Sequence, residues 1–239
     1  MEKFRELGLD GDILKGIADL GFETPSPVQE KAIPVILGEE NDLVVLAQTG
    51  TGKTAAFGLP LLQKINPEWN SVQILVLSPT RELCMQIGSD LKNYSKYLPD
   101  IRVTCVYGGT DIRRQMKELQ KGVHVATPGR LVDLLNRKAL NIETVFAVVL
   151  DEADEMLNMG FQEDLDFILS NTPKDKNTYL FSATMPKEVE RIARNYLVNQ
   201  KEISVGKKNQ GADTVSHQYY MVRAKDCYET LRRIVDCSP

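Results

Sequence analysis

The segment with the most specific chemistry is Ala47-Gln48-Thr49-Gly50-Thr51-Gly52-Lys53-Thr54. The apolar run 43–46 before it predicts a buried strand, and residues 55–59 after it predict the start of a helix. Gly50 and Gly52 allow a sharp turn that presents backbone N–H groups to an anion. A helix that begins near Lys53 adds about half a positive charge at the same place. Although Ala47 replaces the glycine that usually opens the pattern, the order predicts a phosphate-binding loop.

Each residue type in this loop has a use toward a nucleoside triphosphate. Lys53 would reach the β- and γ-phosphates, and the Thr54 hydroxyl would hold Mg²⁺. A plain glycine-rich turn is the alternative, but the Lys-Thr pair and both flanking elements disfavour it. The residues predicted to contact the nucleotide here are Ala47, Gln48, Thr49, Gly50, Thr51, Gly52, Lys53 and Thr54.

A second chemical segment, Asp151-Glu152-Ala153-Asp154, follows the apolar run 145–150. Acidic side chains at the end of a buried strand would complete a site for phosphoryl transfer, in which positioning and charge do most of the catalysis. Asp151 would hold Mg²⁺, mainly through waters, and Glu152 would orient the attacking water. The predicted catalytic residues are therefore Lys53, Asp151 and Glu152. An acidic turn on the solvated surface is the alternative, but the apolar run 145–150 that leads into the tetrad disfavours it.

Three further strand ends share a different design, with a threonine, glycines or an arginine just before a predicted helix. Free N–H groups at helix starts, glycines for close approach and two arginines suit a row of backbone phosphates, and such contacts do not read bases. Helix capping by Thr80, Thr110 and Thr127 beside solvated arginines is the alternative for any single segment. The candidate phosphate contacts are Pro79, Thr80, Arg81, Gly108, Gly109, Thr127, Pro128, Gly129 and Arg130.

One more strand ends in Ser182-Ala183-Thr184, whose two hydroxyls would bond to the acidic tetrad and report the state of the nucleotide. Taken without its context, this segment would be an ordinary turn made by serine and threonine hydroxyls.

Short apolar runs rich in β-branched residues alternate with amphipathic stretches from residue 42 onward. This alternation predicts an α/β fold: a doubly wound, mostly parallel sheet with helices on both faces. Because ligands bind at the carboxyl ends of the strands in such sheets, the segments above fall where chemistry is expected. The predicted strands are 43–47, 74–77, 103–107, 123–126, 146–150, 179–181 and 203–205.

The first 40 residues predict a helical extension. Apolar residues from Leu9 to Leu20 recur at helical spacing, and Ser26 with Pro27 predicts the start of a second helix. Gln29 lies in the first turn of that helix, and its amide offers both donors and an acceptor to an adenine edge. A solvated glutamine is the alternative reading of this residue.

Composition limits the remaining possibilities. The 239 residues are 42% hydrophobic and 26% charged, which suits one large globular domain with the start of a second. No apolar run is long enough to span a bilayer, and the charged first residues do not form a signal peptide. The four cysteines lack CxxC spacing and favour free thiols in the cytoplasm. The net charge of −4 requires any nucleic acid to be held by local groups.

Taken together, the segments resemble the DEAD-box RNA helicases, which are ATP-dependent enzymes with RecA-like domains. The region from Gly21-Phe22 to Gln29 resembles their Q motif, and residues 151–154 spell the name of the family. The phosphate loop, the three strand ends and Ser182-Ala183-Thr184 follow in the family's order. The resemblance covers roughly residues 4–205.

The resemblance implies ATP and Mg²⁺ as cofactors and RNA as a partner. It implies that Gln29 reads adenine beside Phe22 and Pro25, and that Phe4 packs on the base. It also implies that Asp154, Ser182 and Thr184 couple hydrolysis to strand release.

The family also needs a second RecA-like domain with an arginine-rich segment, and residues 1–239 contain no such segment. We therefore expect residues 41–206 to be the first domain. Residues 207–239 would be a linker and the start of a truncated second domain, with a strand at 215–222 and a helix at 225–235.

We expect the chain to be a monomer that binds ATP with little turnover. An ATP-gated RNA clamp without productive unwinding is the alternative function. A DNA-acting ATPase or a kinase fits the segments less well.

Overall fold

The computed structural model describes residues 1–38, 41–69, 71–119, 123–205 and 219–237. It divides into two units, Met1–Lys208 and Asn209–Pro239. No helix within these ranges is long and apolar enough to cross a membrane.

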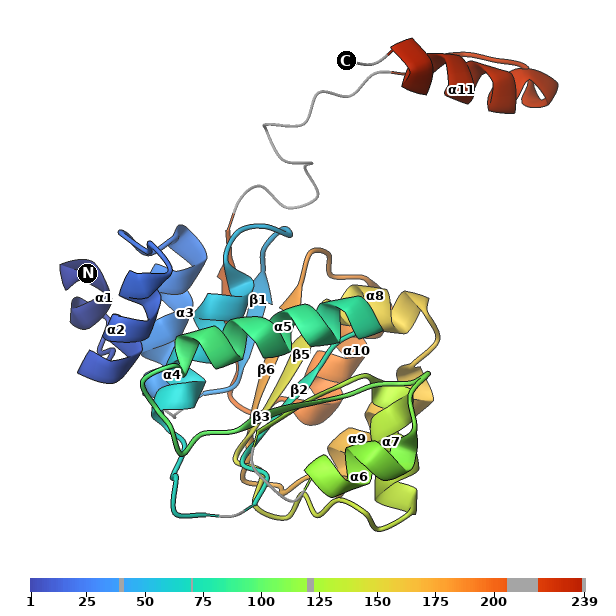
Figure 1. Ribbon diagram of the computed structural model, residues 1–239. Coiled ribbons are helices and arrows are strands. Elements are labelled where there is room, and N and C mark those ends of the chain that lie inside the picture. The colour runs from blue at the N-terminus through green and yellow to red at the C-terminus, as the bar shows by residue number, and fades with distance from the viewer. Residues whose placement is uncertain (39–40, 70, 120–122, 206–218, 238–239) are drawn as a thin grey trace. The chain divides into compact units, whose positions relative to one another are not determined.

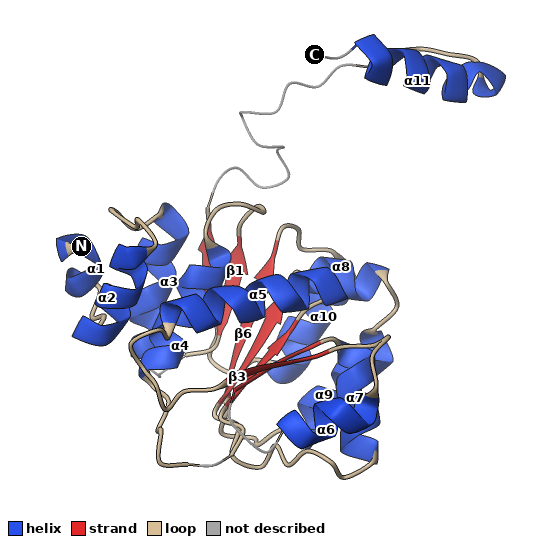
Figure 2. Ribbon diagram, viewed as in Figure 1, coloured by secondary structure: helices blue, strands red, loops and turns tan. Residues whose placement is uncertain are grey.

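The larger unit is built on one seven-stranded sheet in the order β3-β4-β2-β5-β6-β1-β7, and every neighbouring pair is parallel (Figures 1 and 2). The strands are short and rich in Val, Ile and Leu, as expected when both faces of a sheet are covered. They are β1 Leu43–Leu46, β2 Ile74–Leu77, β3 Val103–Val106, β4 Val123–Ala126, β5 Ala147–Asp151, β6 Asn177–Ser182 and β7 Lys201–Ser204.

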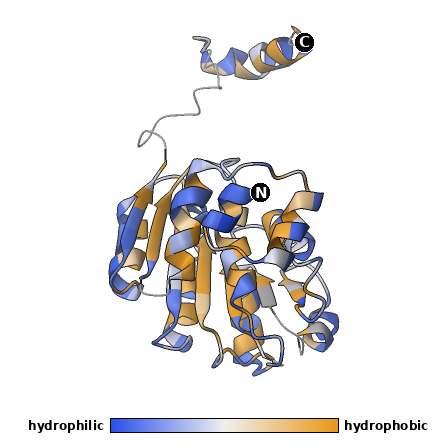
Figure 3. Cartoon of the chain, turned by 90° about the vertical axis from the view of Figure 1, so that its left-hand side faces the viewer, coloured by the Kyte–Doolittle hydropathy of each residue, from blue (hydrophilic) through white to orange (hydrophobic). Residues whose placement is uncertain are grey.

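Alternate residues of the strands face two separate cores, because side chains in a strand point to opposite faces. Val45 of β1 packs in the first core and Val44 in the second, and both are fully buried. Figure 3 shows the apolar strands enclosed between helices whose outer faces are polar. The first core is covered by α1 Glu2–Glu6, α2 Gly11–Asp19, α3 Pro27–Leu37, α4 Lys53–Gln63 and α5 Arg81–Tyr94.

Later helices cover the other core, so the chain fills one face of the sheet before it fills the second. They are α6 Ile112–Glu118, α7 Pro128–Asn136, α8 Ala153–Asn158, α9 Gln162–Asn171 and α10 Lys187–Tyr196.

The predicted α/β fold is confirmed, and each of the seven predicted strands is present with its ends moved by at most a few residues. The helices predicted to begin near Lys53 and after Ser26 are also present, as α4 and α3. The helical residues 1–37 share the first core with the sheet and do not form a separate body.

The smaller unit contains a short 3₁₀ helix, Ala224–Asp226, followed by α11 Cys227–Cys237, which confirms the predicted helix. The predicted strand at 215–222 is not confirmed. Its first part lies outside the described residues, and residues 219–222 have no regular structure. A strand needs a partner for its backbone groups, and no strand is found in the described part of this unit.

Helices α2 and α5 approach closely at Gly16. A Cβ atom on Gly16 would lie 2.5 Å from the backbone oxygen of Tyr94, a contact that no flexible side chain can relieve. Gly11, in the same helix, has no neighbouring atom within 4 Å of its would-be Cβ.

We therefore expect Gly16→Ala to lower the free energy of unfolding by about 1–3 kcal/mol, because two helices must move apart. Gly11→Ala should change it by less than about 1 kcal/mol, in the stabilising direction. Urea denaturation of the two variants measures this difference. Equal stability would show that α2 does not pack on α5 as described.

Candidate nucleotide and RNA site

The loop between β1 and α4 has the conformation that its glycines predict. Gly50 and Gly52 both take left-handed backbone angles, with φ of +77° and +91°. The loop ends at α4, which begins at Lys53. The Thr51 hydroxyl donates to the carbonyl of Gln48 at 2.7 Å and closes the turn from within. Backbone N–H groups at the start of α4 are thus left for an anion.

Lys53 and Asp151 form the buried centre of the site. Lys53 is 6% exposed, and its amine donates to the carbonyl of Ala47 at 3.2 Å. Asp151, at the end of β5, is 3% exposed. Burial raises the pKa of Asp151 to about 6, although the charge of Lys53 opposes the rise. Its Oδ1 atom has no hydrogen-bond partner among the described residues. A buried, unpartnered carboxylate oxygen beside a phosphate-binding loop fits a site for Mg²⁺.

Glu152 occupies a strained backbone position. Its angles, φ +55° and ψ +52°, lie in the left-handed region that costs a residue with a side chain about 1 kcal/mol or more. The residue is half-buried and precedes the first turn of α8. The strain turns the chain sharply after Asp151, so that neighbouring carboxylates of the tetrad take different environments.

Asp154 is bound to the segment that ends β6, as the sequence predicted. Its Oδ2 accepts from the backbone N–H of Thr184 at 2.9 Å and from the Thr184 hydroxyl at 2.7 Å. The Ser182 hydroxyl accepts from the N–H of Asp154 at 3.3 Å. Burial alone would raise the pKa of Asp154, but the hydrogen bonds from Thr184 and Ser182 outweigh it and hold that pKa below its ordinary value.

The strand order explains why this segment reaches both halves of the site. Strand β6 lies between β1, which leads into the phosphate loop, and β5, which ends at Asp151. The carbonyl of Ser182 accepts from the N–H of Ala47 at 3.0 Å. One residue therefore bonds to the phosphate loop through its backbone and to the acidic tetrad through its side chain.

Gln29 connects the N-terminal helices to the phosphate loop. Ser26 is the N-cap of α3, and the Gln29 side-chain oxygen accepts from the backbone N–H of Ser26 at 2.9 Å. The Gln29 amide donates to the carbonyl of Gly52 at 3.2 Å, and the Ser26 hydroxyl donates to the carbonyl of Thr51 at 2.8 Å. Gln29 is 4% exposed, so it is not the solvated residue of the alternative reading. One N–H and one lone pair of its amide are left for a base edge.

These two segments enclose an open hollow of about 610 Å³. Its walls bring the phosphate loop together with the segment predicted to hold adenine. The lining residues are Gly21, Phe22, Glu23, Thr24, Pro25, Ser26, Pro27, Gln29, Gly50, Thr51 and Gly52.

The structure corrects the role expected of Phe4. This residue has no exposed surface, and its ring lies in the first core with its centroid 6.1 Å from that of Phe22. A fully covered ring cannot pack on a base, because α1 would first have to move. Phe22 is half-buried and lines the hollow, so Phe4 supports the aromatic side chain that is available.

The three predicted phosphate-contact segments follow β2, β3 and β4, which are neighbours in the sheet. They therefore lie along one rim. The Arg81 guanidinium stacks on the ring of Tyr107, 4.9 Å from its centroid. Gly109 has φ of +83°. Thr80 is the N-cap of α5, and its hydroxyl accepts from the N–H of Leu83 at 3.2 Å, which confirms its capping role.

Other details of this rim differ from the prediction. Thr127 is the N-cap residue of α7, but its side chain makes no capping hydrogen bond. Thr110 is not the N-cap of α6, because Asp111 takes that place and its carboxylate accepts from the N–H of Arg113. The reason is chemical: a carboxylate one residue further on competes successfully for the free N–H groups.

Arg130 is not a solvated arginine. Its guanidinium donates to the side-chain oxygen of Gln115 at 2.6 Å and to the carbonyl of Thr110 at 3.1 Å. Gln115 in turn donates to the carbonyl of Tyr107 and to the Thr110 hydroxyl. Arg130 thus fixes the loop that contains Gly108 and Gly109 and keeps its remaining donors for a ligand.

Gln115 is the important residue that sequence reasoning missed, because an amide within a polar helix carries no pattern. Asp42 was missed as well, because a single carboxylate directly before a strand carries no pattern either. Its carboxylate accepts from the N–H groups of Thr178 and Val198 and ties β1 to the elements on both sides. No sequence signal marks either residue. The partners of Asp42 lie in distant parts of the chain, and those of Gln115 lie on loops and helices that the fold, not a local pattern, brings together.

The parallel sheet, the phosphate loop after β1 and the acidic residue at the end of β5, one strand away from β1, define the class of P-loop domains with a RecA-like fold. Comparison with known proteins makes the assignment narrower. Residues 26–192 match the family described as DEAD/DEAH box helicase.

Curated relatives give the same result. The chain is 45% identical over 235 residues to the DEAD-box ATP-dependent RNA helicase CshA of Bacillus licheniformis, covering 98% of this chain and 48% of the relative. It is also 45% identical to the ATP-dependent RNA helicase CshA of Listeria monocytogenes, covering 99% of this chain and 45% of that protein. The chain spans about half the length of these relatives.

Solved structures agree with the fold. A DEAD box protein from Methanococcus jannaschii matches with a TM-score of 0.83 and 39% identity, over 98% of this chain and 63% of that one. Yeast Dbp5, solved with Gle1 and IP6, matches with a TM-score of 0.80 and 34% identity, over 85% of this chain and 52% of that one. The chain belongs to the DEAD/DEAH box helicase family.

The raised pKa of Asp151 has a consequence for stability. A carboxyl whose pKa is about 6 when folded and near 3.8 when unfolded destabilises the fold at high pH, and this cost disappears as pH falls through both values. We therefore expect Asp151→Asn to raise the free energy of unfolding at pH 8 by about 1–3 kcal/mol.

The gain from Asp151→Asn should shrink as the pH is lowered from 7 to 4, measured by urea denaturation across that range. Asp154→Asn is the matched control. Because the pKa of Asp154 is lowered in the folded state, its replacement should destabilise the protein at pH 8. A gain at Asp151 that does not depend on pH would contradict the buried charge.

Proposed function

We propose that this chain is the ATP-binding part of an RNA-dependent ATPase that separates short RNA duplexes locally. Membership of the family and the names of the relatives support the substrate class. The observation that carries the proposal is the position of Ser182, which bonds to the phosphate loop on one side and to the acidic tetrad on the other. The same edge of the sheet continues directly into the rim proposed to hold RNA.

The residues of the centre have separate tasks. Lys53 gives up its bond to the Ala47 carbonyl and pairs with the phosphates, for which a cation is the better partner. The Thr54 hydroxyl and the unpartnered oxygen of Asp151 would hold Mg²⁺, and the ion would supply positive charge against the phosphates. Glu152 orients the attacking water from its strained position beside Asp151.

Asp154, Ser182 and Thr184 transmit the state of the centre. Thr184 contributes two of the hydrogen bonds that hold the Asp154 carboxylate. A shift of the tetrad during hydrolysis must therefore move the end of β6 or break these bonds. We assign the coupling of hydrolysis to release of the RNA strand to this contact.

RNA is held through its phosphates by the rim that follows β2, β3 and β4. Arg81 and Arg130 supply charge, and the helix starts after Thr80 and Thr127 supply N–H groups. These contacts do not read bases. Because the net charge is −4, affinity depends on this local cluster.

In the family the second RecA-like domain completes both sites, and we propose that the whole protein acts in the cytoplasm as a monomer. An arginine supplied to a phosphoryl-transfer site is worth about 10³–10⁵ in rate. We therefore expect a polypeptide of residues 1–239 to bind ATP and ADP but to hydrolyse ATP near the background rate, with or without single-stranded RNA. Steady-state phosphate release and titration calorimetry measure the two quantities.

Two variants serve as controls in this experiment. Lys53→Ala should weaken ATP binding about tenfold or more, because the charge of the phosphates loses its partner, whereas Glu152→Gln should retain it. Turnover that rises many-fold with RNA would overturn the expectation for this polypeptide. Full affinity in Lys53→Ala would overturn the nucleotide site. In the full-length protein, RNA-stimulated hydrolysis without strand separation would favour an RNA clamp.

Gln29 should determine the preference for adenine. We expect Gln29→Ala to lower the ratio of ATP to GTP affinity toward one, because the remaining donor and acceptor of its amide are lost. The ratio is the proper readout, since Gln29 also holds Gly52 and its loss should weaken both nucleotides. The reference variant is Gln63→Ala, which removes a half-buried glutamine of α4 that does not line the hollow. An unchanged ratio would rule out base reading by Gln29.

A further inference from the structure

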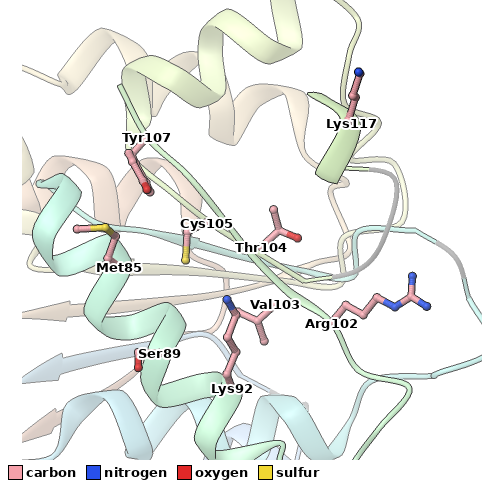
Figure 4. A pocket seen from close by; sticks show the side chains of 9 residues that line it. All are labelled: Met85, Ser89, Lys92, Arg102, Val103, Thr104, Cys105, Tyr107 and Lys117. Atoms are coloured by element: carbon pink, nitrogen blue, oxygen red, sulfur yellow. The ribbon is translucent and has the colours of Figure 1, made fainter. Parts of the chain in front are cut away.

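A second cavity lies at the edge of the sheet, away from the phosphate loop. It has a volume of about 670 Å³ and opens between the edge strand β3, helix α5 and the end of α6 (Figure 4). Cavities of this size hold small ligands in many proteins. Its most distinctive wall residues are Lys92, Arg102, Cys105, Tyr107 and Lys117.

The charged side chains that line this cavity are all positive. Lys92 comes from α5, Arg102 precedes β3, and Lys117 lies in the last turn of α6. No carboxylate lines the cavity, and none of these cations forms an ion pair within the described part of the chain. In a protein of net charge −4, three cations around one hollow that have no ion pair with any described residue favour an anionic ligand.

A thiol lies in the same hollow. Cys105 is half-buried, and Figure 4 shows its sulfur directed into the opening that the amine end of Lys92 also faces. The thiol of Cys105 donates to the carbonyl of Cys84 at 3.5 Å. Gly88 makes room for this sulfur, since a Cβ atom at Gly88 would lie only 2.1 Å from it.

The two cysteines differ in accessibility and acidity. Cys84 has no exposed surface, and its thiol donates to the carbonyl of Val125 at 3.4 Å. The neighbouring Cys84 thiol and the charge of Lys92 lower the pKa of Cys105 to about 7, against the effect of burial. The pKa of Cys84 is raised by its contact with Cys105 and by burial. A thiolate is the reactive form of cysteine, so Cys105 is the more nucleophilic of the pair.

We propose that Cys105 is a modification site for small anionic disulfides, which the cations Lys92, Arg102 and Lys117 attract into the cavity. The thiolate sulfur of Cys105 attacks one sulfur of the disulfide. A new S–S bond forms between them, the original S–S bond breaks, and the second half leaves as a thiolate, while the proton that Cys105 gave up beforehand has passed to the solvent. The disulfide is the oxidant, and Cys105 is oxidised. This assignment does not depend on the proposed helicase function.

The test uses the full chain with Cys227→Ser and Cys237→Ser, because both of those thiols are exposed in the smaller unit. The probes are dithiobis(nitrobenzoate), which carries two carboxylates, and neutral dithiodipyridine. Each rate is followed by absorbance and divided by the rate of the same probe with a small neutral thiol. Mass spectrometry of the peptides locates the modified cysteine.

We expect one fast thiol, located at Cys105, that is lost in Cys105→Ser and retained in Cys84→Ser. The corrected rate should be higher for the anionic probe. Lys92→Ala should lower it about three- to tenfold for that probe, as expected for loss of one nearby charge, and change it little for the neutral probe. Lys187→Ala, an exposed lysine at the start of α10 that does not line the cavity, should change neither rate.

Three results would overturn the proposal. One is modification of Cys105 as slow as that of fully buried Cys84. Another is an equal corrected rate for the two probes. A third is an anionic rate that Lys92→Ala and Lys187→Ala change alike. If Cys105→Ser does not fold, the lysine variants and the peptide masses still decide the question.

Discussion

Everything in this molecule depends on the parallel arrangement of seven strands in one sheet. Parallel strands place all their carboxyl ends at one edge, and the connections there are short loops that lead into helices. The phosphate loop, the acidic tetrad, the serine–threonine segment and the rim proposed to hold RNA therefore lie side by side, although they are scattered over residues 47–184. A fold with antiparallel neighbours would have sent half of them to the opposite edge.

Within this sheet, the place of β6 matters most. It separates the strand that leads to Lys53 from the strand that ends at Asp151, and its own end bonds to both sides. Lys53 and Asp151 are thereby brought close enough for the lysine to influence the pKa of the aspartate without any direct contact between their strands. The site is held together by backbone and hydroxyl groups, which leaves the charged groups available for a ligand.

Most of the fold was predictable from the sequence because its signals are local. Runs such as 43–46 are apolar at every position, as strands buried on both faces must be. Gly50 and Gly52 signal the tight turn of the phosphate loop, because their positive φ angles are strained for residues with a side chain. What failed was the part set by tertiary contacts. Burial decided the role of Phe4, a competing carboxylate displaced Thr110, and Gln115 gained its importance from Arg130 and Tyr107, which no local pattern connects to it.

The pairing of β1 has a consequence for how the protein is made. Among the described residues this strand, Leu43–Leu46, pairs with β6 and β7, which lie at residues 177–182 and 201–204. During synthesis the N-terminal part leaves the ribosome first, so β1 waits with its apolar side chains and backbone groups unpaired until nearly the whole larger unit has emerged. The sheet cannot close by local steps, and contacts between residues so distant in sequence form slowly. The phosphate loop is thus among the last features to form on the nascent chain, and a ribosome that stalls before residue 177 leaves an exposed, aggregation-prone strand.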